Sequence, residues 1–169
     1  HTAGLTYGFH HAHPVDALYR AAGFEWGPPE ALDLAACCDV WAGLPLLFQP
    51  GAEWNYSVAT DVLGRVIEVL SGQRLDQFFA ERILQPLGMV DTRFWAPEDA
   101  RERVAVLYSP QPGTLRAVRN DAMDRIAWQP PRCGLGGDGV ISTVADYHRF
   151  TQMLRRGGEL DGVRLLGNR

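Results

Sequence analysis

The sequence predicts a mainly α-helical fold of the α+β class, with one or two small hairpins. The first observation is an apolar repeat over residues 58–70, where Val58, Val62, Val66 and Leu70 recur every four positions. The second is a set of further amphipathic stretches that end at glycine or proline. The third is that β-type runs occur only as short pieces beside turn residues. These features predict helices joined by turns rather than a continuous sheet.

Two helices are expected before the apolar repeat. One covers residues 14–22, because Pro14 suits the first turn of a helix and Gly23 stops it. The other covers residues 30–42 and ends before Gly43 and Pro45.

The central helix over residues 58–70 has clear ends. Ser57 is its expected N-cap, and Gly72 is the residue that ends it. Its apolar stripe is the expected buried face. Tyr56 stands just before the helix, where the N-terminus favours negative charge.

The second half of the chain has weaker patterns. The expected elements are a helix over 75–84, a helical turn over 97–104, a hairpin that pairs 104–108 with 115–119, and a short strand at 140–141. Thr143 and Asp146 predict a start of the last helix that resembles a capping box. The expected buried side of that helix consists of Tyr147, Phe150, Met153 and Leu154.

The composition is that of a globular protein with one ordinary core. The chain has 169 residues, of which 46% are hydrophobic and 21% charged, and a net charge of −4. This balance gives no electrostatic reason to expect nucleic acid as a partner. No apolar run is long enough to predict a membrane span.

Four stretches carry a resemblance to a known family. They are His1-Thr2-Ala3-Gly4-Leu5, P-G-x-x-W-x-Y-S with D-V-L-G-x-V-I-E-x-x-S-G over 50–72, P-L-G-M-V-D-T over 86–92, and G-G-D-G-V-I-S-T-V-A-D-Y over 136–147. In order and rough spacing they resemble the serine β-lactamase/penicillin-binding-protein superfamily, closest to class C β-lactamases and their esterase relatives. The resemblance covers nearly the whole chain. It implies the helical region of a β-lactamase-like fold, so that 1–169 is one partial domain and the α/β sheet domain is largely missing.

The chain contains no lysine, since all 16 basic residues are arginine. In the resembled family the nucleophile lies in Ser-x-x-Lys, and a later Lys- or His-Thr-Gly strand completes the site. The chain has no Ser-x-x-Lys, and it has no Lys-Thr-Gly or His-Thr-Gly in its later part. We therefore expect an internal fragment of a serine hydrolase that forms its acyl-enzyme on a serine outside this chain, and a fragment that is inactive alone.

Tyr56 is the expected catalytic residue. The resemblance implies that its hydroxyl faces the nucleophilic serine and shuttles its proton together with the motif lysine. A phenol titrates near pH ~10, so it acts as a base at neutral pH only beside cations. The alternative interpretation is an aromatic residue buried beside Trp54 with a satisfied hydroxyl.

Val58, Gly136 and Gly137 are the expected substrate-binding residues. The family usually has Asn at the position of Val58, where its amide contacts the substrate. Valine neither donates nor accepts that hydrogen bond, which favours a carboxylesterase over a β-lactamase. The two glycines are expected to line the acyl pocket or, equally, to form a plain turn. The whole glycine-rich segment 134–139 is expected to bring its backbone close to a neighbour or to the substrate.

Other functions and sites remain open at this point. A non-catalytic binding module and a penicillin-binding protein that acts on peptidoglycan are the alternatives. His10, His11 and His13 form either a metal site or a polar loop, and the loop is preferred. The three cysteines, Cys37, Cys38 and Cys133, do not form a disulfide framework.

The expected partner is a small-molecule ester or lactam. We expect no cofactor and no metal. Self-association is expected through the apolar face that truncation exposes. The compartment, cytoplasmic or periplasmic, is not determined by the sequence.

Overall fold

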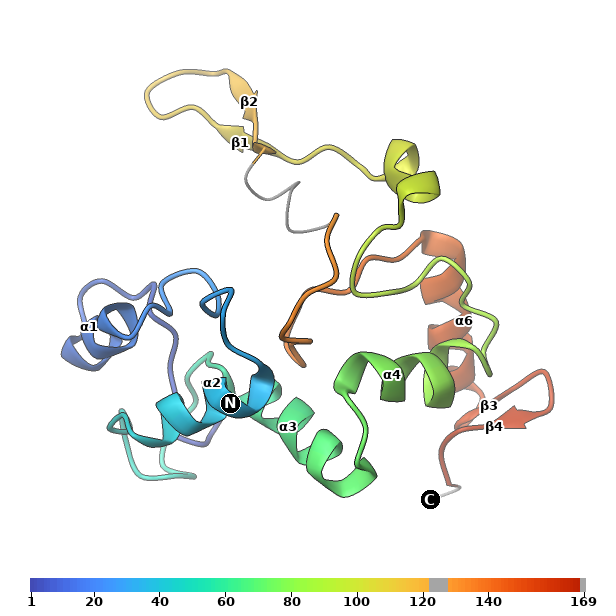
Figure 1. The fold of residues 1–169 in the computed structure, drawn as a ribbon, viewed down its shortest axis with the longest axis horizontal. Helices are drawn as coiled ribbons and strands as arrows, with labels where there is room; N and C mark the ends of the chain where they lie inside the picture. Colours follow the sequence, from blue (N-terminus) through green and yellow to red (C-terminus); the bar gives the residue numbers. More distant parts are fainter. Residues whose placement is uncertain (122–127, 168–169) are drawn as a thin grey trace. The chain divides into compact units, whose positions relative to one another are not determined.

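The computed structural model describes residues 1–121 and 128–167 (Figure 1). Two compact units make up the chain. The first unit consists of residues 1–78 and 132–138, and the second of 79–131 and 139–169. The expectation of one partial domain over 1–169 stays a prediction. Within the described ranges, no helix is both long and apolar enough to span a membrane.

Three helices dominate the first unit, and each begins where a local signal allows it. Helix α1 covers Pro14–Ala21 and is capped by His13, whose Nδ1 accepts a hydrogen bond from the Val15 N–H at 3.2 Å. Helix α2 covers Leu34–Ala42. Its expected start at residue 30 was wrong, because the Asp33 side chain caps the helix by accepting a hydrogen bond from the Ala36 N–H at 2.8 Å.

Helix α3 covers Ala59–Ser71 and confirms the central helix. Gly72 ends it with a φ of +70°, which a glycine adopts without steric cost. The expected N-cap was wrong by one residue. Val58 occupies the N-cap position and makes no side-chain cap, whereas the Ser57 hydroxyl accepts a hydrogen bond from the Ala59 N–H at 3.3 Å.

The buried face of α3 differs from the one expected. Asp61 and Gly64 are buried, whereas Leu63, Val66 and Leu70 are exposed. The physical reason is a close backbone contact: a Cβ placed on Gly64 would lie 3.4 Å from the Cα of Gly136. Glycines let two backbones approach, so this contact rather than the apolar stripe selects the inner face.

The core of the first unit lies around α1 and α2. Its buried side chains are Tyr19, Phe24, Leu34, Cys37, Trp41, Leu75 and Cys133. The rings of Phe24 and Trp41 have centroids 5.3 Å apart. The three cysteines are free thiols, in agreement with packing roles.

The second unit begins within a continuous helical stretch. Helix α4, Leu75–Phe79, runs directly into the π-helical turn η1, Ala80–Leu84, so the expected helix over 75–84 is confirmed. A 3₁₀ turn, η2, covers Glu98–Arg103 within the expected range 97–104. The core of this unit is formed by Leu84, Leu87, Met89, Met153 and Leu160.

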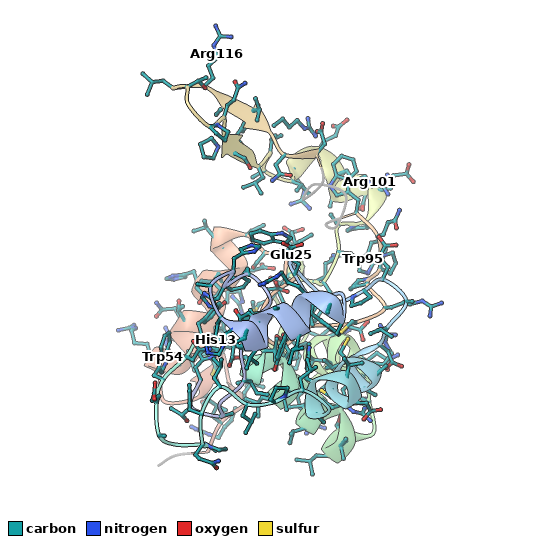
Figure 2. The ribbon with its side chains drawn as sticks, turned by 90° about the vertical axis from the view of Figure 1, so that its left-hand side faces the viewer. His13, Glu25, Trp54, Trp95, Arg101 and Arg116 are labelled. Carbon is teal, nitrogen blue, oxygen red and sulfur yellow. The ribbon has the colours of Figure 1, made fainter. Side chains whose placement is uncertain are left out.

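Two small antiparallel hairpins are the sheet content of the described ranges. Strand β1, Tyr108–Pro110, pairs with β2, Ala117–Arg119, so the first strand starts later than the expected 104. Arg116 lies at the outer end of this hairpin (Figure 2). Strand β3, Glu159–Leu160, pairs with β4, Val163–Arg164.

The turn of the second hairpin follows from its sequence. Asp161 and Gly162 have positive φ values of 49° and 81°. A two-residue turn with both φ values positive matches the twist of the strands, and Asp-Gly is a favoured pair for it. The expected strand at 140–141 is reduced to a single bridge between Ile141 and Arg93.

Helix α6, Val144–Arg155, is the last helix. Thr143 caps it by accepting a hydrogen bond from the Asp146 N–H at 3.2 Å, as expected. Its buried side was only partly right. Met153 is buried, but Tyr147 and Leu154 are exposed. The core of the second unit therefore buries only a narrow stripe of the α6 surface.

Candidate active site

Tyr56 lies where the N-terminal motif supports the central turn. Three backbone N–H groups of the turn donate to carbonyls of residues 1–4: Leu47 to Gly4 O, Gly51 to Thr2 O, and Asn55 to His1 O, at 2.7 to 2.9 Å. The Asn55 side chain also donates to Leu5 O at 3.0 Å. These hydrogen bonds fix the backbone on both sides of the turn, so that Tyr56 lies just before the start of α3.

His1 holds the residue that follows Tyr56. Its Nδ1 accepts a hydrogen bond from the Ser57 N–H at 3.2 Å and lies 3.3 Å from the Ser57 hydroxyl. The His1 ring also contacts the Tyr56 ring, with centroids 4.9 Å apart. A serine beside an imidazole has the composition of a nucleophile pair, but the Ser57 side chain is buried at 1% exposure. This contact therefore orients the backbone at Tyr56.

Tyr7 is the second tyrosine of the site, and sequence reasoning missed it. Its ring lies 5.1 Å from that of Tyr56, and its hydroxyl approaches the Asp61 carboxylate at 3.5 Å. Burial, then the charge of Asp61, raises the pKa of Tyr7 well above its ordinary value. The Tyr7 hydroxyl donates toward this carboxylate, so its proton is directed at Asp61.

Asp61 connects α3 to the glycine-rich segment. It is 2% exposed, and its carboxylate accepts a hydrogen bond from the Gly137 N–H at 2.8 Å. Burial raises the pKa of the Asp61 carboxyl, while the Gly137 N–H opposes this shift. The one signal in the sequence was a charged residue inside an apolar helical repeat.

The predicted substrate-binding residues occupy different environments. Val58 is buried at 3% exposure, and Gly137 is exposed. A Cβ on Gly136 would lie 2.3 Å from the Thr60 carbonyl oxygen, so this position requires glycine for close packing on α3. The close approach of backbone expected for this segment is present at Gly136, whereas a Cβ on Gly137 would meet the Asp61 side chain. The contact of these three residues with a substrate stays a prediction.

Tyr56 itself is accessible. Its side chain is 46% exposed, and its ring is flanked by His1 and Tyr7. The interpretation of Tyr56 as a buried aromatic does not fit this exposure. An accessible hydroxyl at the mouth of a helix can exchange a proton with a bound group, provided that a cation reaches it.

The other serines have structural partners. Ser71 donates to the Ile67 carbonyl at 2.7 Å, and Ser109 accepts from the Asn120 amide at 3.0 Å. The Ser142 hydroxyl lies 2.8 Å from that of Thr92.

The histidine loop shows no metal arrangement. His13 caps α1, and His11 lies 3.7 Å from Glu25. Across residues 1–121 and 128–167, no three His, Cys, Asp or Glu side chains gather as a candidate metal site.

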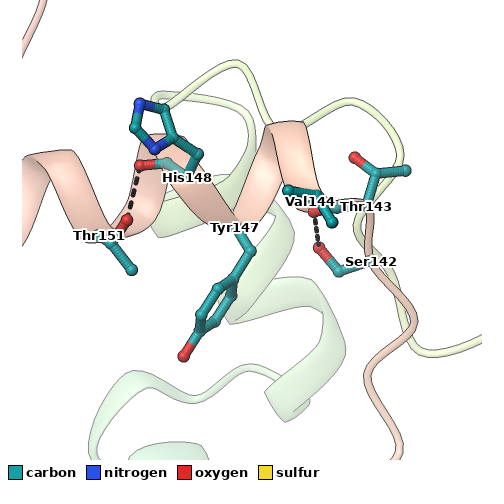
Figure 3. Close-up of a pocket in the computed structure, with 6 residues that line it drawn as sticks. All are labelled: Ser142, Thr143, Val144, Tyr147, His148 and Thr151. Atoms are coloured by element: carbon teal, nitrogen blue, oxygen red, sulfur yellow. Dashed lines mark hydrogen bonds between the residues drawn. The ribbon is translucent and has the colours of Figure 1, made fainter.

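An open pocket in the second unit has a different character. It measures about 450 Å³ and is lined along the start of α6 by Ser142, Thr143, Val144, Tyr147, His148 and Thr151 (Figure 3). Figure 3 shows the hydroxyls of Ser142 and Thr151 bonded to backbone carbonyls of Thr143 and His148. None of the predicted site residues lines this pocket.

Comparison with known proteins identifies the family. The model of the family described as Beta-lactamase matches residues 1–166. The chain belongs to the Beta-lactamase family. This confirms the family resemblance carried by the four motifs.

Two esterases are among the relatives of this Beta-lactamase-family chain. Esterase EstB of Burkholderia gladioli is 32% identical over 171 residues, covering 92% of this chain and 42% of the relative. Lovastatin esterase of Penicillium rubens is 31% identical over 156 residues, which cover 91% of this chain and 37% of the relative. Protein Rv1367c of Mycobacterium tuberculosis is 39% identical over 170 residues, covering 98% and 39%. The chain thus spans well under half the length of these relatives.

Solved structures agree with the family. EstCE1, a hydrolase with promiscuous acyltransferase activity, matches with a TM-score of 0.75 at 26% identity, covering 98% of this chain and 46% of that one. Unliganded simvastatin synthase LovD from Aspergillus terreus matches with a TM-score of 0.70 at 27% identity, covering 94% and 38%. Esterase and acyltransferase homologues place the chain in a serine hydrolase and acyltransferase superfamily.

Proposed function

We propose that residues 1–169 supply the tyrosine side of a carboxylesterase active site. The observation that carries this proposal is the accessible Tyr56 at the start of α3, held by His1 and flanked by Tyr7. In the parent protein, meaning the longer chain proposed to contain these residues, a Ser-x-x-Lys serine attacks the ester carbonyl. Tyr56 takes the serine proton and later returns it to the leaving alcohol.

The nucleophile is proposed to lie outside this chain. A serine nucleophile needs access to substrate and a base to take its proton. Ser57 is buried, and no lysine is present to build Ser-x-x-Lys. A cation from outside the chain is also proposed, because a phenol acts as a base at neutral pH only beside a cation and the chain has no lysine to supply the one that the family motif uses. Residues 1–169 alone are therefore proposed to be inactive.

An ester is the proposed substrate class, in preference to a β-lactam. Val58 has no amide to bond the side chain of a lactam, and it lies buried at the helix start. Esterases among the relatives agree with this preference.

The test compares substrates and variants in the parent protein. Hydrolysis of 4-nitrophenyl butyrate is expected to exceed that of a cephalosporin, and the 169-residue chain is expected to hydrolyse neither. Faster cephalosporin hydrolysis by the parent would reject the ester preference. Turnover by the 169-residue chain would reject the external nucleophile.

Self-association of the isolated chain is proposed through α3. Leu63, Val66, Val69 and Leu70 are exposed along this helix. Contiguous apolar surface of this kind favours association. Sedimentation of the 169-residue chain is expected to show dimers or larger species that Leu63→Glu reduces, whereas Leu115→Glu, at an exposed leucine of the second unit, leaves them unchanged.

A further inference from the structure

A row of four aromatic rings leads away from the candidate catalytic tyrosine. The row consists of Tyr56, Tyr7, Phe9 and Trp26, all in the first unit. Consecutive ring centroids lie 5.1, 4.9 and 6.1 Å apart. The last two pairs are stacked with interplanar angles of 19° and 20°, so the faces of Tyr7, Phe9 and Trp26 are nearly parallel.

The backbone under the row is fixed by α1. Asp16, which is fully buried, accepts hydrogen bonds from the Thr6 hydroxyl at 2.8 Å and from the His10 N–H at 3.0 Å. Arg20 donates to the Gly8 carbonyl at 2.7 Å. These bonds hold the segment that carries Tyr7 and Phe9 on both sides, so the rings are organised before any ligand arrives.

The outer end of the row is unusually open. Trp26 is 81% exposed, although indole is among the side chains that gain most from burial. It immediately precedes Gly27-Pro28-Pro29, a turn segment that follows α1. An exposed indole that is linked through the half-buried Phe9 and Tyr7 to the candidate catalytic Tyr56 offers an aromatic contact to a ring-containing ligand group beside the site.

We propose that this row is the subsite for a flat, ring-containing group of the ester substrate. The inference rests on the proposed function, because it places the reacting carbonyl at Tyr56. A ring system extending from that carbonyl packs along the edges of the Tyr7 and Phe9 rings and stacks on the exposed Trp26. Esters without a ring use the Tyr56 end of the row alone.

The experiment compares two acetate esters in the parent protein. 2-Naphthyl acetate carries a flat ring system, whereas ethyl acetate carries none. Trp26→Ala and Phe9→Leu are expected to lower kcat/KM for 2-naphthyl acetate about fivefold, the size of one lost aromatic contact, and to leave ethyl acetate unchanged. Leu115→Ala, at an exposed apolar site in the second unit, is the control and changes neither rate. Equal losses for both esters, or no loss for either, would overturn the inference.

A binding measurement separates this inference from the proposed function. 2-Naphthol is titrated calorimetrically into the parent and into the Trp26→Ala protein. If the parent hydrolyses no ester, the proposed function fails, but about fivefold weaker naphthol binding in the variant still supports the subsite. Equal naphthol affinity in the two proteins overturns the subsite, including the case in which another segment of the parent covers the row.

Discussion

Helices α3 and α6 share one structural feature at their N-termini, but its surroundings differ between the two helices. Each has a buried aspartate in its first turn, Asp61 in α3 and Asp146 in α6. Each aspartate accepts a backbone N–H from a segment distant in the sequence, that of Gly137 or that of Asp91, at 2.8 Å. In both places a helix start is fastened to a remote part of the chain.

The two aspartates differ in the side-chain hydroxyl that approaches them in addition to the backbone N–H. At α6, Asp146 also accepts the Thr92 hydroxyl at 2.8 Å, and Thr143 caps the helix. At α3 the N-cap residue makes no side-chain bond, and Asp61 is approached only at 3.5 Å by the hydroxyl of Tyr7. The start of α6 is thus satisfied internally, whereas that of α3 lies against the tyrosines of the candidate site.

The largest expected effect tests the functional half of this comparison. In the parent protein, Tyr56→Phe is expected to lower kcat/KM for an ester about 100-fold or more, since it removes a proton-transfer group. Tyr147→Phe, at an exposed tyrosine in the first turn of α6, is the matched control and keeps the rate. Full activity in the Tyr56→Phe protein would remove Tyr56 from the mechanism.

The next effect tests the structural half. Asp146→Ala leaves the Asp91 N–H and the Thr92 hydroxyl without their acceptor, and is expected to lower the free energy of unfolding by about 2–3 kcal/mol. Asp161→Asn, which keeps a residue suited to the positive φ of this turn and removes only the charge of an exposed ion pair with Arg149, is expected to cost under about 1 kcal/mol. Urea unfolding of the parent measures both. Equal losses of unfolding free energy in the two variants would show that the Asp146 hydrogen bonds contribute no more to stability than an exposed ion pair.

A smaller effect concerns the cap of α6. Thr143→Ala removes the acceptor of the Asp146 N–H and is expected to cost about 1 kcal/mol in unfolding free energy. Thr151→Ala, further along the same helix, serves as the control, because its hydroxyl donates to a carbonyl of its own helix. A larger loss at Thr151 would contradict the assignment of the cap.

The smallest effect is a pH dependence at Asp61. Burial raises the pKa of this carboxyl in the folded state above its unfolded value, so its protonated form favours folding. Its contribution to stability therefore falls as pH rises from the unfolded pKa through the folded one. Asp61→Asn keeps an acceptor oxygen and removes this titration. The variant is expected to gain stability relative to the original protein as the pH rises above about 4, measured by urea unfolding. A difference that does not change with pH would reject the raised pKa.

The sequence was sufficient to locate the helices but not to predict which side of each helix is buried. The apolar repeat located α3 within one residue, because periodicity reports local conformation. It did not reveal that Asp61 and Gly64 face inward, because that choice depends on Gly136, which is remote in the sequence. For the same reason, α6 was found while Tyr147 was wrongly placed inside.

The candidate site was accessible to sequence reasoning only through its motifs. Tyr56 was singled out by the family pattern around it. Tyr7 and Trp26 have no pattern of their own. The position of Tyr7 beside Tyr56 depends on hydrogen bonds from α1 to Gly8 and His10. Tertiary contacts of this kind leave no periodic signal in the chain.

The central claim is that this chain provides the tyrosine of a serine hydrolase site and not its nucleophile. Labelling the parent protein with a fluorophosphonate, followed by peptide mapping, tests this most directly, because the reagent marks the activated serine. The account predicts a labelled serine outside residues 1–169, in a Ser-x-x-Lys sequence. A label on Ser57, Ser71, Ser109 or Ser142 would contradict it.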